Sequence, residues 1–125
     1  MNDSPHHLRF GTPLEEWIRA FPAELPRDAV GLWQISNSLR RGFELSDSVF
    51  QISIRKSVKA LLDAGAVPVF GSSADRRWHL AEGFDGTSDV IVERVMSYLG
   101  GLGREPDVGD LWLALPSFVE ASSGA

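Results

Sequence analysis

The feature that most limits the fold of this chain is a long amphipathic helix pattern followed at once by a helix stop and a hairpin pattern. Ser46 is a good N-cap and Gly65 a good stop. The segments "AVPVF" and "RRWHL" then alternate around a polar loop and predict two short strands. Pro68 favours a sheet edge for the first strand, because proline lacks an amide N–H. The apolar residues at helical spacing are Phe50, Ile54, Val58, Leu61 and Leu62.

Two helices are predicted before this unit. The segment "TPLEEWIRAF" predicts a helix over 13–21, with Thr12 as cap and Glu15 completing a capping box. Pro13 suits the first helical position. A second amphipathic stripe, in "RDAVGLWQISNSLRRGF", predicts a helix that ends at Arg41 with Gly42 as its left-handed cap.

One helix and one strand are predicted after the hairpin. Thr87 or Ser88 can cap a helix whose inward face carries Ile91, Val92, Val95 and Leu99, and "GGLG" ends it. The segment "LWLALP" predicts a third strand that stops at Pro116. We therefore expect an α+β fold of four helices and a small antiparallel sheet, made of the hairpin plus one C-terminal strand, in the order ααα-ββ-α-β.

Length and composition indicate one self-sufficient domain. The 125 residues, 43% of them hydrophobic, are enough to build a core. We expect a flexible N-terminal tail over 1–12, a single domain over 13–119 and a flexible C-terminal tail over 120–125. The chain has no cysteine, which suits a reducing compartment, and no signal-peptide or membrane-span pattern. These features predict a cytoplasmic location.

Charge is divided unevenly along the chain. The net charge is −2 over residues 1–39, +3 over 40–79 and −6 over 80–125. The middle segment could therefore meet phosphate or an acidic protein, and the C-terminal third could meet a basic partner.

Residues 28–80 resemble a winged helix-turn-helix segment. The resemblance implies that the long helix lies in the major groove of DNA and that the hairpin contacts the backbone. Three features oppose it: Glu44 and Asp47 lie where the helix would approach DNA, the total charge is negative, and the last helix and strand have no place in the minimal fold. The simpler interpretation of the same residues is the solvated side of a core helix and an exposed hairpin end. The nucleic-acid candidates are Ser48, Gln51, Arg55, Lys56, Lys59, Arg76 and Arg77.

The acidic residues of the last third form a second candidate surface. They could be ordinary solvated charges or a face for a basic protein, since charge complementarity speeds encounter and selects the partner. Trp78, beside the hairpin loop, is the tryptophan most expected to be exposed and to act as an anchor. The predicted protein-binding residues are Glu82, Asp85, Asp89, Glu105, Asp107, Asp110 and Trp78, and Glu93 belongs to the same acidic set.

No stretch carries a catalytic, cofactor or metal signature. His6 and His7 lie in the expected tail, and His79 is expected to face solvent. A triad of Ser72 or Ser73 with His79 and an acid has no support from spacing. "DGTSD" lacks the ligand pattern of a calcium loop, and "LGGLG" follows a helix, so its amides are not arranged to bind phosphate. We therefore expect no enzyme and no cofactor.

The interpretation that follows is a small non-catalytic protein that binds a basic protein partner. In size, negative charge and lack of chemistry the chain is similar to bacterial immunity and antitoxin-type proteins, which bind and block a toxin. The alternative is a winged-helix-like nucleic-acid-binding regulator that uses the positive middle segment. The two differ in geometry, because a reading helix must present a continuous basic face away from the acidic loops.

Overall fold

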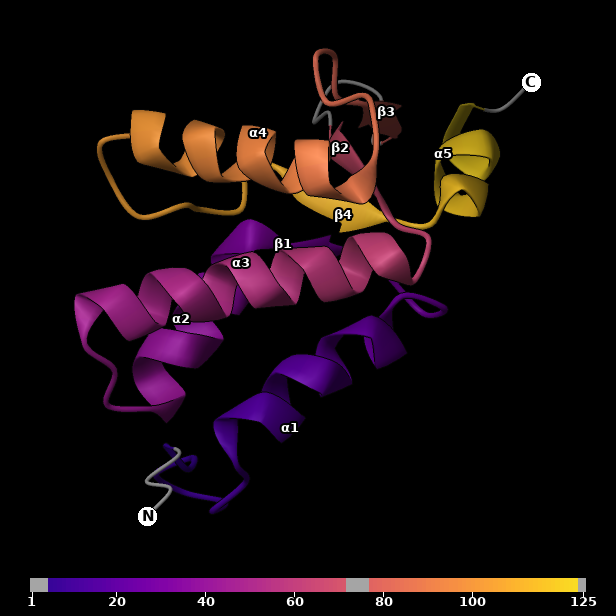
Figure 1. The fold of residues 1–125 in the computed structure, drawn as a ribbon. Helices are drawn as coiled ribbons and strands as arrows, with labels where there is room; N and C mark the ends of the chain where they lie inside the picture. Colours follow the sequence, from indigo (N-terminus) through magenta and orange to yellow (C-terminus); the bar gives the residue numbers. More distant parts are fainter. Residues whose placement is uncertain (1–4, 72–76, 124–125) are drawn as a thin grey trace.

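The α+β fold predicted from the sequence is confirmed by a computed structural model of the chain, which describes residues 5–71 and 77–123 (Figure 1). Within these residues there are five helices, a 3-10 segment and one four-stranded sheet. In chain order the elements are α1 (Leu14–Ala20), η1 (Phe21–Glu24), β1 (Val30–Gly31), α2 (Leu32–Gly42), α3 (Asp47–Asp63), β2 (Val67–Gly71), β3 (Trp78–Leu80), α4 (Ser88–Gly101), β4 (Trp112–Ala114) and α5 (Pro116–Ser123).

The sheet is antiparallel throughout and has the strand order β1-β4-β2-β3. The last strand in the sequence, β4, is thus an inner strand: Val30 pairs with Leu113, and Leu113 in turn pairs with Pro68. The hairpin is confirmed, but the edge position predicted for its first strand is wrong. The backbone of Pro68 faces β3, since its carbonyl accepts the amide of Ala81 at 3.0 Å. Ala81 follows the last residue of β3, so the missing N–H of Pro68 removes no hydrogen bond between the paired residues of β2 and β3.

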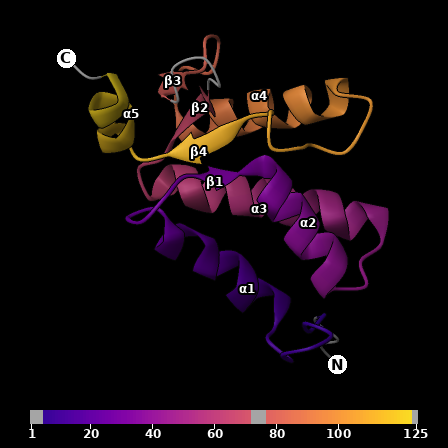
Figure 2. The same cartoon turned by 180° about the vertical axis from the view of Figure 1, so that it is seen from behind.

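Helix α3 is the centre of the helical layer. In Figure 1, α4 lies above α3 and α1 below it, and Figure 2, from behind, shows β1 and β4 in front of α3. The contacts agree, since α3 packs against α1, α2 and α4. Most buried apolar side chains form one core between these helices and the inner face of the sheet. Its fully buried members include Ile35, Leu39, Val58, Leu61, Val95, Leu111 and Leu113.

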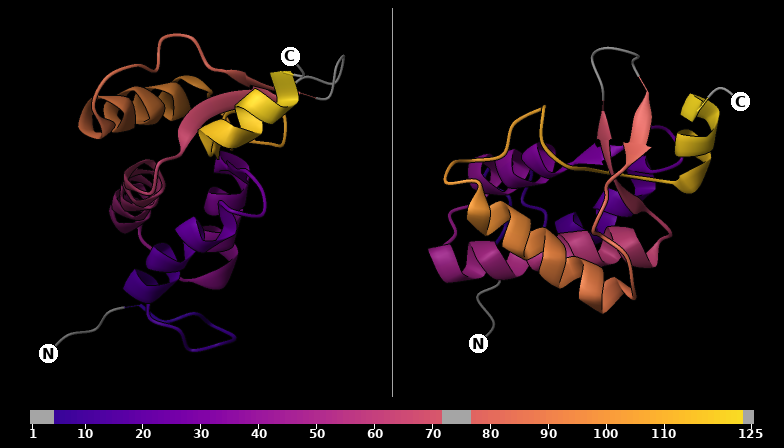
Figure 3. Two further views of the ribbon diagram at one scale, coloured as in Figure 1. Left: turned by 90° about the vertical axis from the view of Figure 1, so that its right-hand side faces the viewer. Right: turned by 90° about the horizontal axis from the view of Figure 1, so that it is seen from above.

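The second face of the sheet has a smaller apolar cluster under α5. Figure 3 shows α5 beside the hairpin, at the end of the molecule away from the N-terminus. Phe118 of α5 packs there with Trp78 and Trp112. This helix was not predicted: a tail is expected from residue 120, but α5 continues to Ser123.

The predicted ends of α3 and α4 are confirmed. Ser46 Oγ accepts the amide of Val49, and Thr87 Oγ1 accepts the amide of Val90, both at 3.4 Å. Gly65 ends α3 with a φ of +102°, which favours glycine. Each of these three signals acts on the end of its own helix, so it needs no contact with a distant part of the chain.

The ends of the first two helices differ from the prediction. Pro13 is the N-cap of α1, and Thr12 makes no capping hydrogen bond. Gly42 is the last residue of α2 and has no positive φ; the chain leaves the helix through an extended Phe43. Strand β1 was also missed, because two residues before a helix carry no strand pattern of their own.

Candidate protein-binding site

The basic side chains of α3 are paired with acids of α1 and α4 and with Asp63 of α3 itself. Each pair is largely exposed, so its main effect is to cancel charge locally and its stabilising effect is small. The hydrogen bond to Asp63 raises the pKa of Lys59, and the same bond lowers the pKa of Asp63. The pairs are Arg55 with Glu93, Lys56 with Glu15 at 2.7 Å, and Lys59 with Asp63 at 2.9 Å and with Asp89 at 3.6 Å.

These pairs line a groove of about 590 Å³ with α3 as its floor and α1 and α4 as its walls. Its apolar lining consists of Ile18 of α1, Ala60 of α3 and Val92 of α4. The lining contains four basic and four acidic side chains, so the groove has no net charge. A continuous basic face, which the nucleic-acid interpretation requires of this helix, is interrupted by the acids of α1 and α4.

The remaining nucleic-acid candidates are spread over the surface. Ser48 and Gln51 are exposed on the N-terminal half of α3, and Ser48 Oγ lies 3.4 Å from Ser46 Oγ. Arg77 is exposed just before β3. Arg76 lies outside the described residues. So do Ser72 and Ser73, the serines considered for a catalytic triad with His79.

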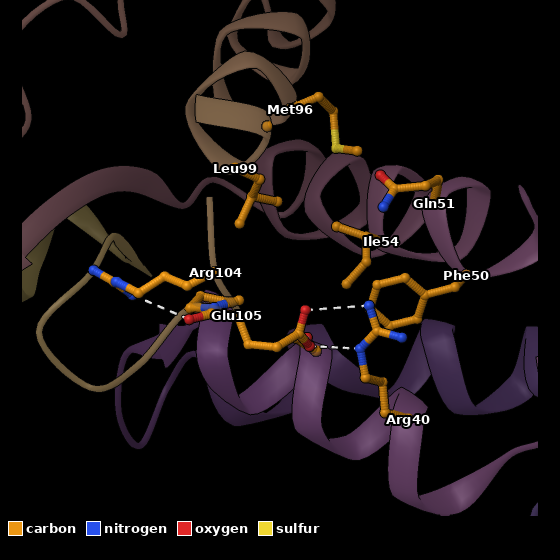
Figure 4. A pocket seen from close by; sticks show the side chains of 11 residues that line it. Arg40, Phe50, Gln51, Ile54, Met96, Leu99, Arg104 and Glu105 are labelled. Carbon is orange, nitrogen blue, oxygen red and sulfur yellow. Dashed lines mark hydrogen bonds and ion pairs between the residues drawn. The ribbon is translucent and has the colours of Figure 1, made fainter. Parts of the chain in front are cut away.

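Glu105 is held against α2 at a small cavity of about 110 Å³. Its carboxylate accepts two hydrogen bonds from Arg40, at 2.5 and 3.2 Å, and one from Ser36 at 3.0 Å. The bond from Arg40 is the main cause that lowers the pKa of Glu105. Figure 4 shows Arg40 and Glu105 facing each other, and the guanidinium lies 3.7 Å from the ring centre of Phe50. Glu105 therefore fastens the loop after α4 to α2.

Asp110 is buried and cannot contribute to an exposed acidic face. Its side chain accepts hydrogen bonds from Arg104 at 2.7 and 3.1 Å, from the Tyr98 hydroxyl at 3.1 Å and from the amide of Asp107 at 2.7 Å. The Arg104 guanidinium is the main cause that lowers the pKa of Asp110 to about 2. The predicted surface carboxylate is thus a structural one, since a buried charge is kept only with such partners.

Asp107 belongs to the same loop and also serves its shape. Its Oδ1 accepts the amide of Gly109 at 2.9 Å, and its Oδ2 lies 3.5 Å from Arg104. The three acids predicted after α4 therefore face Arg40 and Arg104 of the protein itself. No local sequence signal shows this network, because Arg104 and Asp110 lie in an irregular loop whose conformation decides which side chains meet.

The acids at and before the start of α4 are placed differently. We call residues 82–89, the loop before α4 together with the first two residues of the helix, the acidic loop; it contains Glu82 and Asp85 before the helix and Asp89 in its first turn, all exposed. Asp89 pairs with α3, whereas Glu82 and Asp85 form no ion pair within the described part of the chain. An Arg94 hydrogen bond of 3.1 Å to the Gly83 carbonyl ties this loop to α4.

Two exposed apolar side chains flank the acidic loop. Leu80, the last residue of β3, is 62% exposed, and Val90, in the first turn of α4, is 43% exposed. Trp78, the predicted anchor, is only half-buried against Trp112, with ring centres 5.2 Å apart. The surface from Leu80 to Val90 thus combines apolar side chains with two carboxylates, those of Glu82 and Asp85, that form no ion pair among the residues the structure describes.

Comparisons with protein-family models, with curated proteins and with solved structures found no match to this chain. Among residues 5–71 and 77–123, no group of three or more His, Cys, Asp or Glu side chains is arranged to hold a metal ion. In the same residues, no helix has the length and apolar character needed to cross a membrane.

Proposed function

We propose that this is a non-catalytic binding protein for a basic protein partner, and that residues 80–90 form the centre of its contact surface. The observation that carries the proposal is that Glu82 and Asp85 are exposed and make no ion pair within the described residues, between exposed Leu80 and Val90. Unpaired carboxylates steer a basic partner, and apolar side chains supply contact area once it has docked. By analogy with immunity and antitoxin-type proteins, binding would neutralise the partner.

The proposal narrows the acidic surface expected from the sequence. Glu105, Asp107 and Asp110 are engaged by arginines of the same chain, so reversing them would disturb the fold as well as any interface. Glu82 and Asp85 can be reversed without breaking an ion pair of the described structure. This difference supports placing the test on the acidic loop.

The test is affinity capture from a lysate of the source cells, with and without nuclease, using the wild type and the double variant Glu82→Lys/Asp85→Lys. A matched control, Glu24→Lys/Glu44→Lys, changes the net charge equally at two exposed acids elsewhere. We expect the wild type and the control to retain the same basic protein after nuclease treatment, and the loop variant to bind it at least about tenfold more weakly.

Equal capture by the loop variant and the control would contradict the proposed surface. Material that disappears on nuclease treatment would instead support the alternative, a nucleic-acid-binding regulator. Circular dichroism of all three proteins would show that the charge reversals leave the fold intact.

A further inference from the structure

His7 is built into the structure, although the sequence places it in an N-terminal tail. Its imidazole stacks on Trp17 of α1, with ring centres 4.4 Å apart and planes at 28°. Phe43, after α2, meets the ring edge-on at 5.3 Å, and Phe10 lies at 4.9 Å. One imidazole thus joins the segment over residues 5–13, which we call the N-terminal arm, to both α1 and the end of α2.

The end of α2 leaves room for this ring only because it carries a glycine. A Cβ added at Gly42 would lie 2.6 Å from Cδ2 and Nε2 of His7. The neighbouring backbone is tied down as well, since Leu8 donates its amide to the Gly42 carbonyl at 2.8 Å. This close approach explains why position 42 holds a glycine, for which the sequence had suggested a left-handed helix cap.

The arm is shaped by two hydrogen bonds that end on one nitrogen. Nδ1 of His7 accepts the amide of Arg9 at 3.1 Å and the amide of Phe10 at 3.2 Å. Both bonds need the lone pair of Nδ1, so the neutral ring carries its proton on Nε2. A second proton can enter only at Nδ1, where it removes the acceptor and points an N–H at two N–H groups.

The charged and titratable groups around His7 lie on three elements. They are His6 and Arg9 in the arm, Glu15, Glu16 and Arg19 on α1, and Arg40, Arg41 and Glu44 on and just after α2. None of them forms an ion pair with the imidazole. The nearest partners of the ring are aromatic.

We propose that His7 is a pH-sensitive latch: the neutral imidazole docks the N-terminal arm on α1 and α2, and its protonation releases the arm. Histidine is the side chain whose charge ordinarily changes between about pH 5 and pH 8. Protonation breaks both bonds to Nδ1 and turns an N–H toward the two amides that this nitrogen held. Release uncovers the faces of Trp17 and Phe43 that the imidazole occupies.

The test is amide hydrogen exchange of the full chain, followed residue by residue by NMR at about pH 8 and about pH 5 and corrected for the intrinsic pH dependence of exchange. The reporters are the amides of Leu8, Arg9 and Phe10. On acidification we expect the protection factor of each of these amides to fall about tenfold or more, because each loses its hydrogen bond when the arm is released. The amide of Ala66, bonded to the Leu61 carbonyl at 3.1 Å, is the internal control and keeps its protection.

Three variants separate the latch from other titrations. His7→Phe keeps a ring but has no acceptor, so we expect low protection in the arm at both pH values. His6→Gln and His79→Gln remove the other histidines and keep the full response. The latch is refuted if the wild-type arm keeps its protection at the lower pH, or if His7→Phe shows the same pH response as the wild type.

Discussion

Replacing Asp110 by asparagine tests whether this buried carboxylate holds the loop between α4 and β4 through its charge. Asparagine has nearly the same shape but cannot attract the Arg104 guanidinium, which donates two hydrogen bonds to the native carboxylate. In Asp110→Asn, an NH2 group replaces one carboxylate oxygen, so its hydrogens face N–H or O–H donors that bond the native carboxylate. We therefore expect Asp110→Asn to fold with reduced stability.

The magnitude follows from the pKa of Asp110, which folding lowers from 3.8 to about 2. A difference of this size corresponds to about 2 kcal/mol of stabilisation. Because the folded-state pKa is the lower one, the stabilisation is complete above the unfolded-state pKa of 3.8 and is lost as the pH falls toward about 2. About half of it remains at pH 3.

The assay is urea unfolding of the wild type, Asp110→Asn and the control Asp107→Asn between pH 7 and pH 3. We expect Asp110→Asn to lower the free energy of unfolding by about 2 kcal/mol at pH 7, and this difference to shrink by about half at pH 3. Asp107 is exposed, so its variant should cost much less. A difference that is the same at both pH values, or equal for the two variants, would refute the role of the charge.

Two further predictions concern the central helix. Leu61→Ala, at a fully buried position, should lower the free energy of unfolding by about 2–5 kcal/mol in urea titrations, and a loss below about 1 kcal/mol would show that the site is not close-packed. Ser46→Ala should cost about 1 kcal/mol in the same assay because the amide of Val49 loses its acceptor, whereas Ser97→Ala, at an exposed position within α4, should cost almost nothing.

The elements that could be predicted are those defined by neighbours in the sequence. For α3 and α4, the apolar spacing, the hydroxyl caps and the glycine after α3 all lie within one helix length, so they indicate the same structure before any tertiary contact is known. Strand β1 exists only because Val30 and Gly31 pair with β4, far along the chain. Helix α5 is short, and its two apolar side chains, Phe118 and Val119, pack into the smaller apolar cluster that also contains Trp78 and Trp112.

The candidate surface was predictable as a region but not residue by residue. Counting charges located the acidic third of the chain, and the acidic loop lies within it. Counting could not show that Glu105 meets Arg40, which is distant in sequence, or that Asp110 turns inward toward Arg104 and Tyr98. Whether a carboxylate faces solvent or an internal arginine depends on the loop conformation, which charge alone does not determine.

The inner position of β4 has a consequence for how the protein is made. Until residues 112–114 leave the ribosome, β1 has no strand partner and β2 has one unpaired edge, so the nascent chain can form its helices but cannot close its sheet. Open strand edges invite pairing with other chains. A chain truncated before Trp112 would therefore be an aggregation hazard, because it cannot close the sheet.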